Sequence, residues 1–283
     1  MTTDLCRSGI GIFDSGFGGL TVMRAIRQLL PCENIIYFGD TARLPYGNKS
    51  PDIILRYAIE NSTFLIDQGI KVLVIACHTA CSFALEHIRA ALEIPVVGIS
   101  EPGIAEVVNL SKNGHVAIIG TRATIASGIY QQKLQLALPK SEITAIACPL
   151  FVPLVEEGFL NHPLTELVVQ EYLGPLKSME IDTILLGCTH YPLLQPAIQK
   201  HQGDKVVLVD PANACAKKTQ TLLRELGLEN QEKSQPLYQF YVSDDPDKFR
   251  MHGKTFLNYP IEDVRFNFSP SSFVPILNCD ENI

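Results

Sequence analysis

Short runs of apolar, often β-branched residues alternate with longer amphipathic segments along most of the chain. In the N-terminal part, the apolar runs predict buried strands at residues 9–13, 34–38, 71–76 and 95–98. The segments between them predict amphipathic helices at residues 20–30, 51–68 and 79–92. Because strands that alternate with helices of this length form parallel sheets with helices on both faces, the pattern predicts the α/β fold class.

A second series of the same kind follows. It predicts strands at residues 115–119, 143–147, 182–186 and 205–209, with helices at residues 125–138 and 164–173. Two turns share one design, in which a buried strand leads through a small residue to a cysteine. The chain reads Cys-His-Thr from Cys77 and Cys-Thr-His from Cys188, about one α/β domain apart. We interpret this likeness as a duplication.

The duplication predicts two similar parallel-sheet domains related by pseudo-twofold symmetry, with a shared cleft between them. The first would comprise residues 1–99 plus 210–283, and the second residues 100–209. The crossovers are expected near residues 100–103 and 210–213, and the C-terminal segment is expected to return to the first domain.

Composition narrows the function classes. Of 283 residues, 46% are hydrophobic and 19% are charged, which suits packed cores rather than a disordered chain. Acidic residues outnumber basic ones by 30 to 23 without a Lys/Arg cluster, so no nucleic-acid partner is expected. The apolar runs are too short to span a bilayer and no export signal is visible, so we expect no membrane partner and a cytoplasmic location.

Two polar segments follow strands, where ligands bind in open parallel sheets. The turn Asp-Ser-Gly-Phe-Gly-Gly at residues 14–19 could cradle an anionic group on its amides. It fits neither the dinucleotide fingerprint nor the P-loop, which disfavours a nucleotide site. The loop at residues 39–50 is long and polar, which is typical of a loop that lines a site.

The eight cysteines form no C-x-x-C pair, which disfavours a thioredoxin-like site and a zinc ribbon. Cys77 and Cys188 each face a predicted helix N-terminus, where amide dipoles favour a thiolate. A phosphatase loop would need Arg six residues later, where the chain has Phe83 and Leu194. A cysteine hydrolase has no use for a second, mirrored thiol.

Racemisation removes a proton from one face of a carbon and returns one to the other face, so it needs two opposed bases. Two pseudo-twofold domains that each place a thiol in a shared cleft supply that geometry. The pair of cysteines therefore favours a racemase or epimerase. A zinc site formed by both thiols with His78 and His190 stays an alternative, as does a non-catalytic amino-acid-binding protein.

Five segments carry a resemblance to a known family. They read GIFDSGFGGLTV (11–22), YFGDTARLPYG (37–47), VIACHTA (74–80), CPLFVPLVE (148–156) and LLGCTHYPLL (185–194). With these segments the chain resembles the glutamate racemases of the cofactor-independent aspartate/glutamate racemase superfamily. The resemblance implies two α/β domains with the active site between them, no cofactor and no metal. It also implies an isomerase that interconverts L- and D-glutamate and supplies this D-amino acid for peptidoglycan, and hence for cell wall biogenesis and cell shape.

By the same resemblance, Cys77 and Cys188 would be the two acid/base thiols. Asp14 would assist Cys77, while Glu156 and His190 would assist Cys188. The implied substrate-binding positions are Asp14, Ser15, Tyr46, Gly47, His78, Thr79, Thr189 and His190.

The chain departs from the family at His78, where Asn is usual. An imidazole can also donate a hydrogen bond to a carboxylate, but it is larger and titratable. Glu156 is preferred to Glu157 from its place after the Phe-Val-Pro run. A sister racemase for aspartate or a hydantoin would share the cysteine pair, and assembly into a homodimer stays open.

Overall fold

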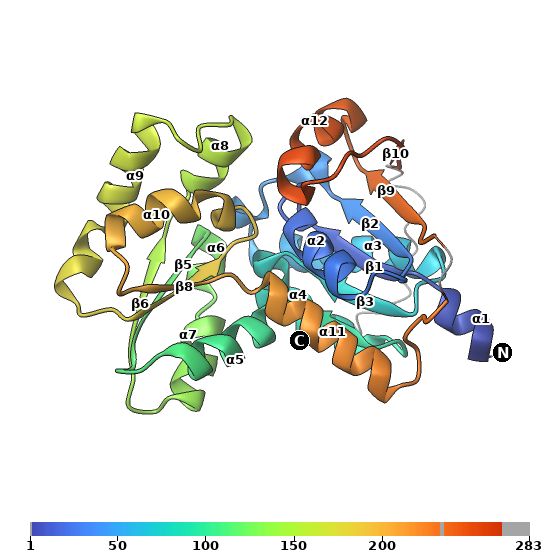
Figure 1. Cartoon of the computed structure of the whole chain (residues 1–283), viewed down its shortest axis with the longest axis horizontal. Helices are drawn as coiled ribbons and strands as arrows, with labels where there is room; N and C mark the ends of the chain where they lie inside the picture. The colour runs from blue at the N-terminus through green and yellow to red at the C-terminus, as the bar shows by residue number, and fades with distance from the viewer. Residues whose placement is uncertain (1, 233–234, 268–283) are drawn as a thin grey trace.

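The computed structural model describes residues 2–232 and 235–267, which form two parallel sheets flanked by helices. Figure 1 shows the first sheet with its helices on the right and the second sheet with its helices on the left. The α/β fold class predicted from the alternating pattern is confirmed.

The first sheet has six parallel strands in the order β10-β9-β2-β1-β3-β4. Its strands are β1 (Ile10–Asp14), β2 (Ile35–Gly39), β3 (Val72–Ile75), β4 (Val96–Gly98), β9 (Tyr238–Val242) and β10 (Val264–Phe266). All residues of β1, β2 and β3 are buried, as expected for strands covered on both faces. This burial is why unbroken apolar runs located these strands in the sequence.

The second sheet has four parallel strands in the order β6-β5-β7-β8. They are β5 (His115–Gly120), β6 (Glu142–Ala147), β7 (Thr183–Gly187) and β8 (Val207–Val209). In chain order, this arrangement repeats the arrangement of β1 to β4, so β3 and β7 are counterparts. The first sheet is wider because β9 and β10, from the C-terminal part of the chain, extend it beyond β2.

Helices cover both sheets (Figure 1). Around the first sheet they are α1 (Thr2–Arg7), α2 (Leu20–Leu29), α3 (Pro51–Asp67), α4 (His78–Ala91), α11 (Ala212–Glu225) and α12 (Pro246–Leu257). Around the second sheet they are α5 (Ser100–Leu110), α6 (Arg122–Ala126), α7 (Ile129–Ala137), α8 (Phe151–Glu156), α9 (Pro163–Leu173) and α10 (Gln195–Gln202). Short 3-10 helices are η1 (Thr41–Arg43), η2 (Tyr46–Asn48), η3 (Gly174–Ser178) and η4 (Tyr191–Leu194).

One predicted helix was wrong. The sequence predicted a single helix at residues 125–138, but the chain forms α6 and α7 with a break between them. Gly128 stands at the break with a φ of 69°, a left-handed conformation that suits glycine and ends the first helix. At the two expected crossovers, α5 begins and packs on β7, whereas α11 begins and packs on α2.

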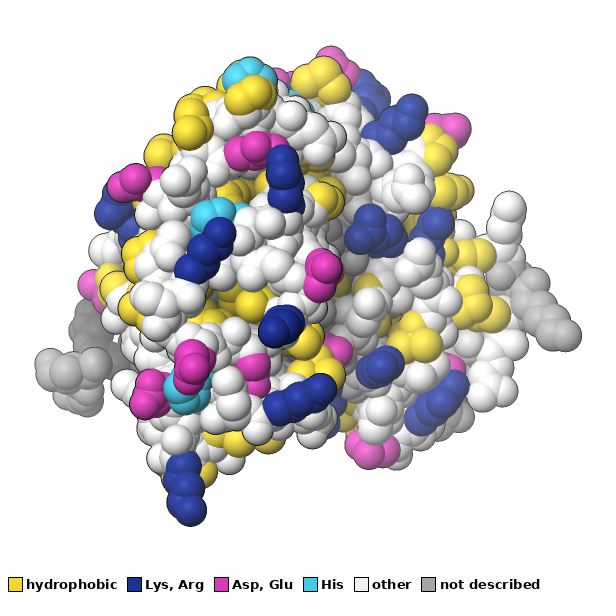
Figure 2. Space-filling model, turned by 60° about the vertical axis from the view of Figure 1, so that its left-hand side comes forward, with side chains coloured by type: hydrophobic (Ala, Val, Ile, Leu, Met, Phe, Trp, Pro, Cys, Tyr) yellow, Lys and Arg dark blue, Asp and Glu magenta, His cyan; other side chains and the backbone are white. Residues whose placement is uncertain are grey.

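None of the described helices is long and apolar enough to cross a membrane. On the face seen in Figure 2, basic, acidic and apolar side chains are interspersed, and the Lys and Arg side chains do not gather into one patch.

Candidate active site

The carboxyl ends of β1, β3 and β7 meet at one pocket built from both halves of the chain. Of the sequence-predicted site residues, the following line it: Ser15, Tyr46, Gly47, Cys77, His78, Thr79, Glu156, Cys188, Thr189 and His190. Among the residues that the structure describes, no Lys or Arg belongs to this lining. Asp14, at the end of β1, lies behind the lining and contacts it through hydrogen bonds.

Cys77 follows β3 and caps the N-terminus of the 14-residue helix α4. Its Sγ accepts a hydrogen bond from the amide of Ala80 at 3.4 Å, so the first turn of the helix points its donors at the sulfur. Burial raises the pKa of the Cys77 thiol, and the negative charge of Asp14 raises it further. Cys77 is therefore a protonated thiol at neutral pH, and a strong base once ionised.

Asp14 connects the two halves of the site. Its carboxylate accepts the amide of Gly16 at 3.0 Å and the hydroxyl of Thr189 at 3.4 Å. Burial raises the pKa of Asp14, while the charge of His190 and the amide hydrogen bonds offset part of that rise. The carboxyl group thus lies beside the Cys77 turn and touches the Cys188 turn.

Cys188 has a different set of neighbours. Its Sγ lies 3.9 Å from Nδ1 of His190, and Nε2 of His190 lies 3.2 Å from Oε1 of Glu156. Burial opposes a charged imidazole, but the contacts with Cys188 and Glu156 outweigh it and raise the pKa of His190 to about 10. An imidazolium at this position stabilises negative charge on the sulfur. Glu156, rather than its neighbour Glu157, makes this contact.

Two glycines let the halves approach closely around the pocket. A Cβ at Gly18 would lie 2.1 Å from Oγ1 of Thr189 and 2.7 Å from Nδ1 of His190. A Cβ at Gly47 would lie 2.5 Å from Cβ of Thr121. Real Cβ atoms do not come this close, so any larger residue would hold the halves apart at both places.

Thr121 is a pocket residue that the sequence analysis missed. Its hydroxyl lies 3.0 Å from the hydroxyl of Thr79 in the other half, and Thr124 completes a cluster of three hydroxyls. The signal for it was present, because Thr121 directly follows β5, the counterpart of the strand that ends at Asp14. A search for polar residues just after the strands, which selected Asp14, would also have selected Thr121.

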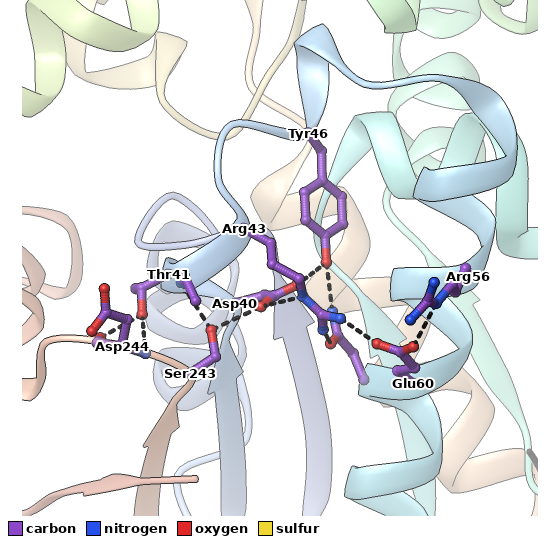
Figure 3. A network of polar contacts seen from close by, with 10 residues as sticks. Asp40, Thr41, Arg43, Tyr46, Arg56, Glu60, Ser243 and Asp244 are labelled. Atoms are coloured by element: carbon purple, nitrogen blue, oxygen red, sulfur yellow. Dashed lines mark hydrogen bonds and ion pairs between the residues drawn. The ribbon is translucent and has the colours of Figure 1, made fainter. Parts of the chain in front are cut away.

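A polar network holds the loop that contributes Tyr46 and Gly47 (Figure 3). Asp40, fully buried, accepts hydrogen bonds from Tyr46, from Arg43 and, at 2.8 Å, from Ser243 of the segment after β9. Arg43 also pairs with Glu60 of α3. The network ties this long loop to α3 and to the C-terminal part of the first sheet.

His78 lies at the start of α4 with its Nδ1 2.5 Å from the hydroxyl of Tyr130. Its Nε2 is buried without a hydrogen-bond partner.

Within residues 2–232 and 235–267, no group of three or more His, Cys, Asp or Glu side chains could hold a metal ion, so the zinc alternative gains no support there.

Known proteins that are similar to this chain are named racemases. The model of the Asp/Glu/Hydantoin racemase family matches residues 19–219. A glutamate racemase of Geobacter metallireducens is 45% identical over 255 residues, which cover 90% of this chain and 94% of that protein.

Solved structures agree with the sequence comparisons. The structure of glutamate racemase from Francisella tularensis in complex with D-glutamate has a TM-score of 0.89 and 39% identity, and the match covers 95% of this chain and 100% of that one. Glutamate racemase from Thermus thermophilus in complex with beta-chloro-D-alanine has a TM-score of 0.84 and 40% identity, with 93% and 97% covered. The chain belongs to the Asp/Glu/hydantoin racemase family.

Proposed function

We propose that this protein is a glutamate racemase, which interconverts L- and D-glutamate by moving protons between two cysteine thiols and the α-carbon. The observation that carries the proposal is the placement of Cys77 and Cys188 on one pocket, each after the corresponding strand of its own sheet. The strong similarity to proteins named glutamate racemase supports the choice of substrate.

The reaction needs one thiolate and one thiol at a time. A thiolate takes the α-proton, and the electron pair of the broken C–H bond stays on the substrate, delocalised into its carboxylate. The opposite thiol then gives its proton to the other face of the carbon and becomes the thiolate. After one turnover the two sulfurs have exchanged protonation states, and exchange with solvent restores them.

The two sulfurs have different neighbours. Cys77 is buried beside Asp14 and holds its proton, so it is ready to act as the acid. Cys188 lies beside His190, which is paired with Glu156. We propose that Cys188 deprotonates L-glutamate and Cys77 deprotonates D-glutamate.

The α-proton is far less acidic than a thiol, so the pocket must stabilise the negative charge that develops on the substrate. Hydroxyl and amide donors at strand ends and helix N-termini are suited to this task, because burial strengthens their interaction with an anion. We propose that the substrate contacts Ser15, Tyr46, Gly47, His78, Thr79, Thr121, Thr189 and His190, while Asp14 orients this lining through its hydrogen bonds with Gly16 and Thr189. The proton transfers proposed for the two thiols use no cofactor.

Other members of the family set the main alternative. The structural neighbours named aspartate racemase or its homologue are only 18% identical, with TM-scores of 0.53 and 0.56, and share the fold alone. Turnover of glutamate, aspartate and a hydantoin side by side under the same conditions separates the substrates. A larger kcat/KM for aspartate or the hydantoin would overturn the choice of glutamate.

The proposed biological role follows from the reaction. D-Glutamate made by such an enzyme would supply peptidoglycan synthesis, whose precursors are assembled in the cytoplasm, so we propose a cytoplasmic location.

We also propose two domains, one of residues 1–99 plus 210–283 and one of residues 100–209. The membership of the described strands in the two sheets supports this division.

The decisive test follows two signals at once. The purified protein is incubated with L-glutamate in heavy water, and both chirality and deuterium at the α-carbon are measured over time. We expect D-glutamate to form with deuterium at its α-position. Binding of glutamate without deuterium incorporation would instead indicate an amino-acid-binding protein.

A further inference from the structure

His78 presents an unsatisfied nitrogen to the candidate active site. The side chain is buried and lines the pocket, and its Nε2 has no hydrogen-bond partner. Burial lowers the pKa of His78 to about 3, so the imidazole is neutral at physiological pH and carries its single proton on one of its two nitrogens. Whether Nε2 is a donor or an acceptor toward the pocket depends on that choice.

The other nitrogen of His78 has a partner from the second half of the chain. Its Nδ1 lies 2.5 Å from the hydroxyl oxygen of Tyr130 on α7, and Tyr130 is fully buried. Burial raises the pKa of Tyr130 well above its ordinary value, so the phenol keeps its proton.

We propose that Tyr130 is a positioning residue, whose O–H donates to Nδ1 of His78 and so fixes the tautomer in which Nε2–H donates into the pocket. The proton on one imidazole nitrogen is set by the hydrogen bond that the other nitrogen makes. The order is then Tyr130 to His78 to the ligand: the phenol O–H donates to Nδ1, and Nε2–H donates to the ligand.

The reverse order fits the pocket less well. If Nδ1–H donated to Tyr130, a bare lone pair of Nε2 would face the ligand. This step rests on the proposed function, because glutamate brings two carboxylates into a lining whose described residues include no Lys or Arg. Glu156 offers an acceptor for the substrate ammonium. Both ring nitrogens of the charged His190 already contact Cys188 and Glu156, so donors for the carboxylates must come from neutral groups. A donating Nε2 meets that need.

The tautomer can be read directly in the substrate-free protein. Nitrogen-15 spectra of histidine-labelled protein distinguish a protonated from an unprotonated ring nitrogen, and a His78→Asn variant assigns the signals among the seven histidines. We expect Nε2 to be protonated and Nδ1 to be unprotonated. Protonation of Nδ1 instead would overturn the proposal, whatever reaction the enzyme catalyses.

A Tyr130→Phe variant then tests the cause. It removes the hydroxyl but keeps the ring, and we expect the His78 signals to move toward a mixture of tautomers. In the racemase assay, kcat/KM should fall about three- to ten-fold, the ratio expected for one lost hydrogen bond. Unchanged His78 signals in a folded Tyr130→Phe protein would refute the role of Tyr130.

Repeating the Tyr130→Phe substitution in His78→Asn protein distinguishes a positioning role of Tyr130 from a purely structural one. In His78→Asn protein the amide carries its donor regardless of Tyr130, so adding Tyr130→Phe should change kcat/KM by less than about two-fold. An equal loss in both backgrounds would mean that Tyr130 acts only structurally. If the unaltered enzyme does not racemise glutamate, the proposed function fails, but the tautomer measurement still decides this inference.

Discussion

Cys77 and Cys188 occupy the same place in two sheets with the same strand order, yet their surroundings differ. Cys77 caps a long helix and lies beside a carboxylate, Asp14. Cys188 precedes only the short 3-10 helix η4 and lies beside an imidazole, His190, that is itself paired with a glutamate. The backbone repeats, but the groups that control the charge of each sulfur do not.

This difference shows how a symmetric scaffold serves a reaction whose two directions are not identical. A racemase must hold one thiol protonated and the other ionised when the substrate arrives. Each enantiomer needs a different sulfur as the base, so unequal surroundings allow each sulfur to be adapted to its own half of the reaction. If both turns are required but differ in role, substitutions at either cysteine should abolish racemisation and leave different partial reactions.

The largest effect is expected from replacing either sulfur. Cys77→Ser and Cys188→Ser should each lower the racemisation rate by about a thousand-fold or more, because a serine hydroxyl is a far weaker acid than a thiol. Polarimetry or a coupled assay of D-glutamate measures the loss. Cys81→Ser is the matched control, since Cys81 lies one helical turn later, is not in the pocket lining, and its Sγ donates to the Ile75 carbonyl. Full racemisation by either active-site variant would remove that cysteine from the mechanism.

The same two variants reveal the division of roles. With a substrate analogue that carries a leaving group on its β-carbon, elimination needs only the first deprotonation. We expect Cys77→Ser to retain elimination from the L-analogue and Cys188→Ser to retain it from the D-analogue. Equal loss with both enantiomers in both variants would contradict the assignment of one base to each face.

The His190 imidazolium should make the Cys188 side a source of pH-dependent stability. Its pKa rises from about 6.5 when unfolded to about 10 in the fold. A raised pKa stabilises the protonated folded state, so this contribution is complete below about pH 6.5 and is lost as pH rises through about 10. Denaturant unfolding of the unaltered protein and of His190→Gln should therefore differ most at low pH.

The same substitution at exposed His87 gives the background for that measurement. A difference between the unaltered protein and His190→Gln that stays constant from pH 6 to pH 10 would show that the imidazole is not charged in the fold.

Gly18 tests how closely the two turns must approach. In Gly18→Ala the new methyl group would strike Thr189 and His190, so the Cys188 turn must move away from the Asp14 turn. Overpacking of this kind costs about 1–3 kcal/mol, and we expect kcat/KM to fall about ten-fold or more. Gly174→Ala is the control, because nothing lies within 4 Å of its added Cβ. Equal activity of the two variants would mean that this contact is dispensable.

The smallest of these effects concerns a loop that only the first half possesses. Tyr46→Phe removes the hydrogen bond to Asp40 and the one from Asn61 while the ring stays in place. We expect KM for glutamate to rise about two- to five-fold, with kcat less affected, because a loosened loop binds substrate less well. Steady-state kinetics of Tyr57→Phe, in the neighbouring ring, provide the comparison. A fall in kcat at constant KM would assign Tyr46 a different role.

The sequence located the parts of the molecule that depend on local pattern. The runs in β1, β3 and β7 are apolar throughout because both faces of each strand are buried, and their ends identify Asp14, Cys77 and Cys188. The prediction of a single helix at residues 125–138 was wrong because Gly128 adopts a left-handed conformation inside an otherwise helical pattern.

What the sequence did not predict depends on contacts between distant segments. Tyr130 reads as one more apolar position of α7, and only the packing of α7 against the start of α4 brings its hydroxyl to His78. The hydrogen bond between Asp40 and Ser243 likewise joins residues that follow two strands, β2 and β9, far apart in the chain. Partners of this kind have no periodicity or motif, so they emerge only in three dimensions.

Because the described lining of the pocket contains no Lys or Arg, the enzyme should respond weakly to the ionic strength of its medium. Affinity that depends on pairing a ligand with exposed cations weakens as ionic strength rises, because mobile ions screen the attraction. Here buried amides, hydroxyls and an imidazole would hold the substrate, and salt screens such short buried contacts little. KM for glutamate should therefore stay nearly constant from dilute buffer to several hundred millimolar salt, and the enzyme would work equally well across wide changes in the salinity around it.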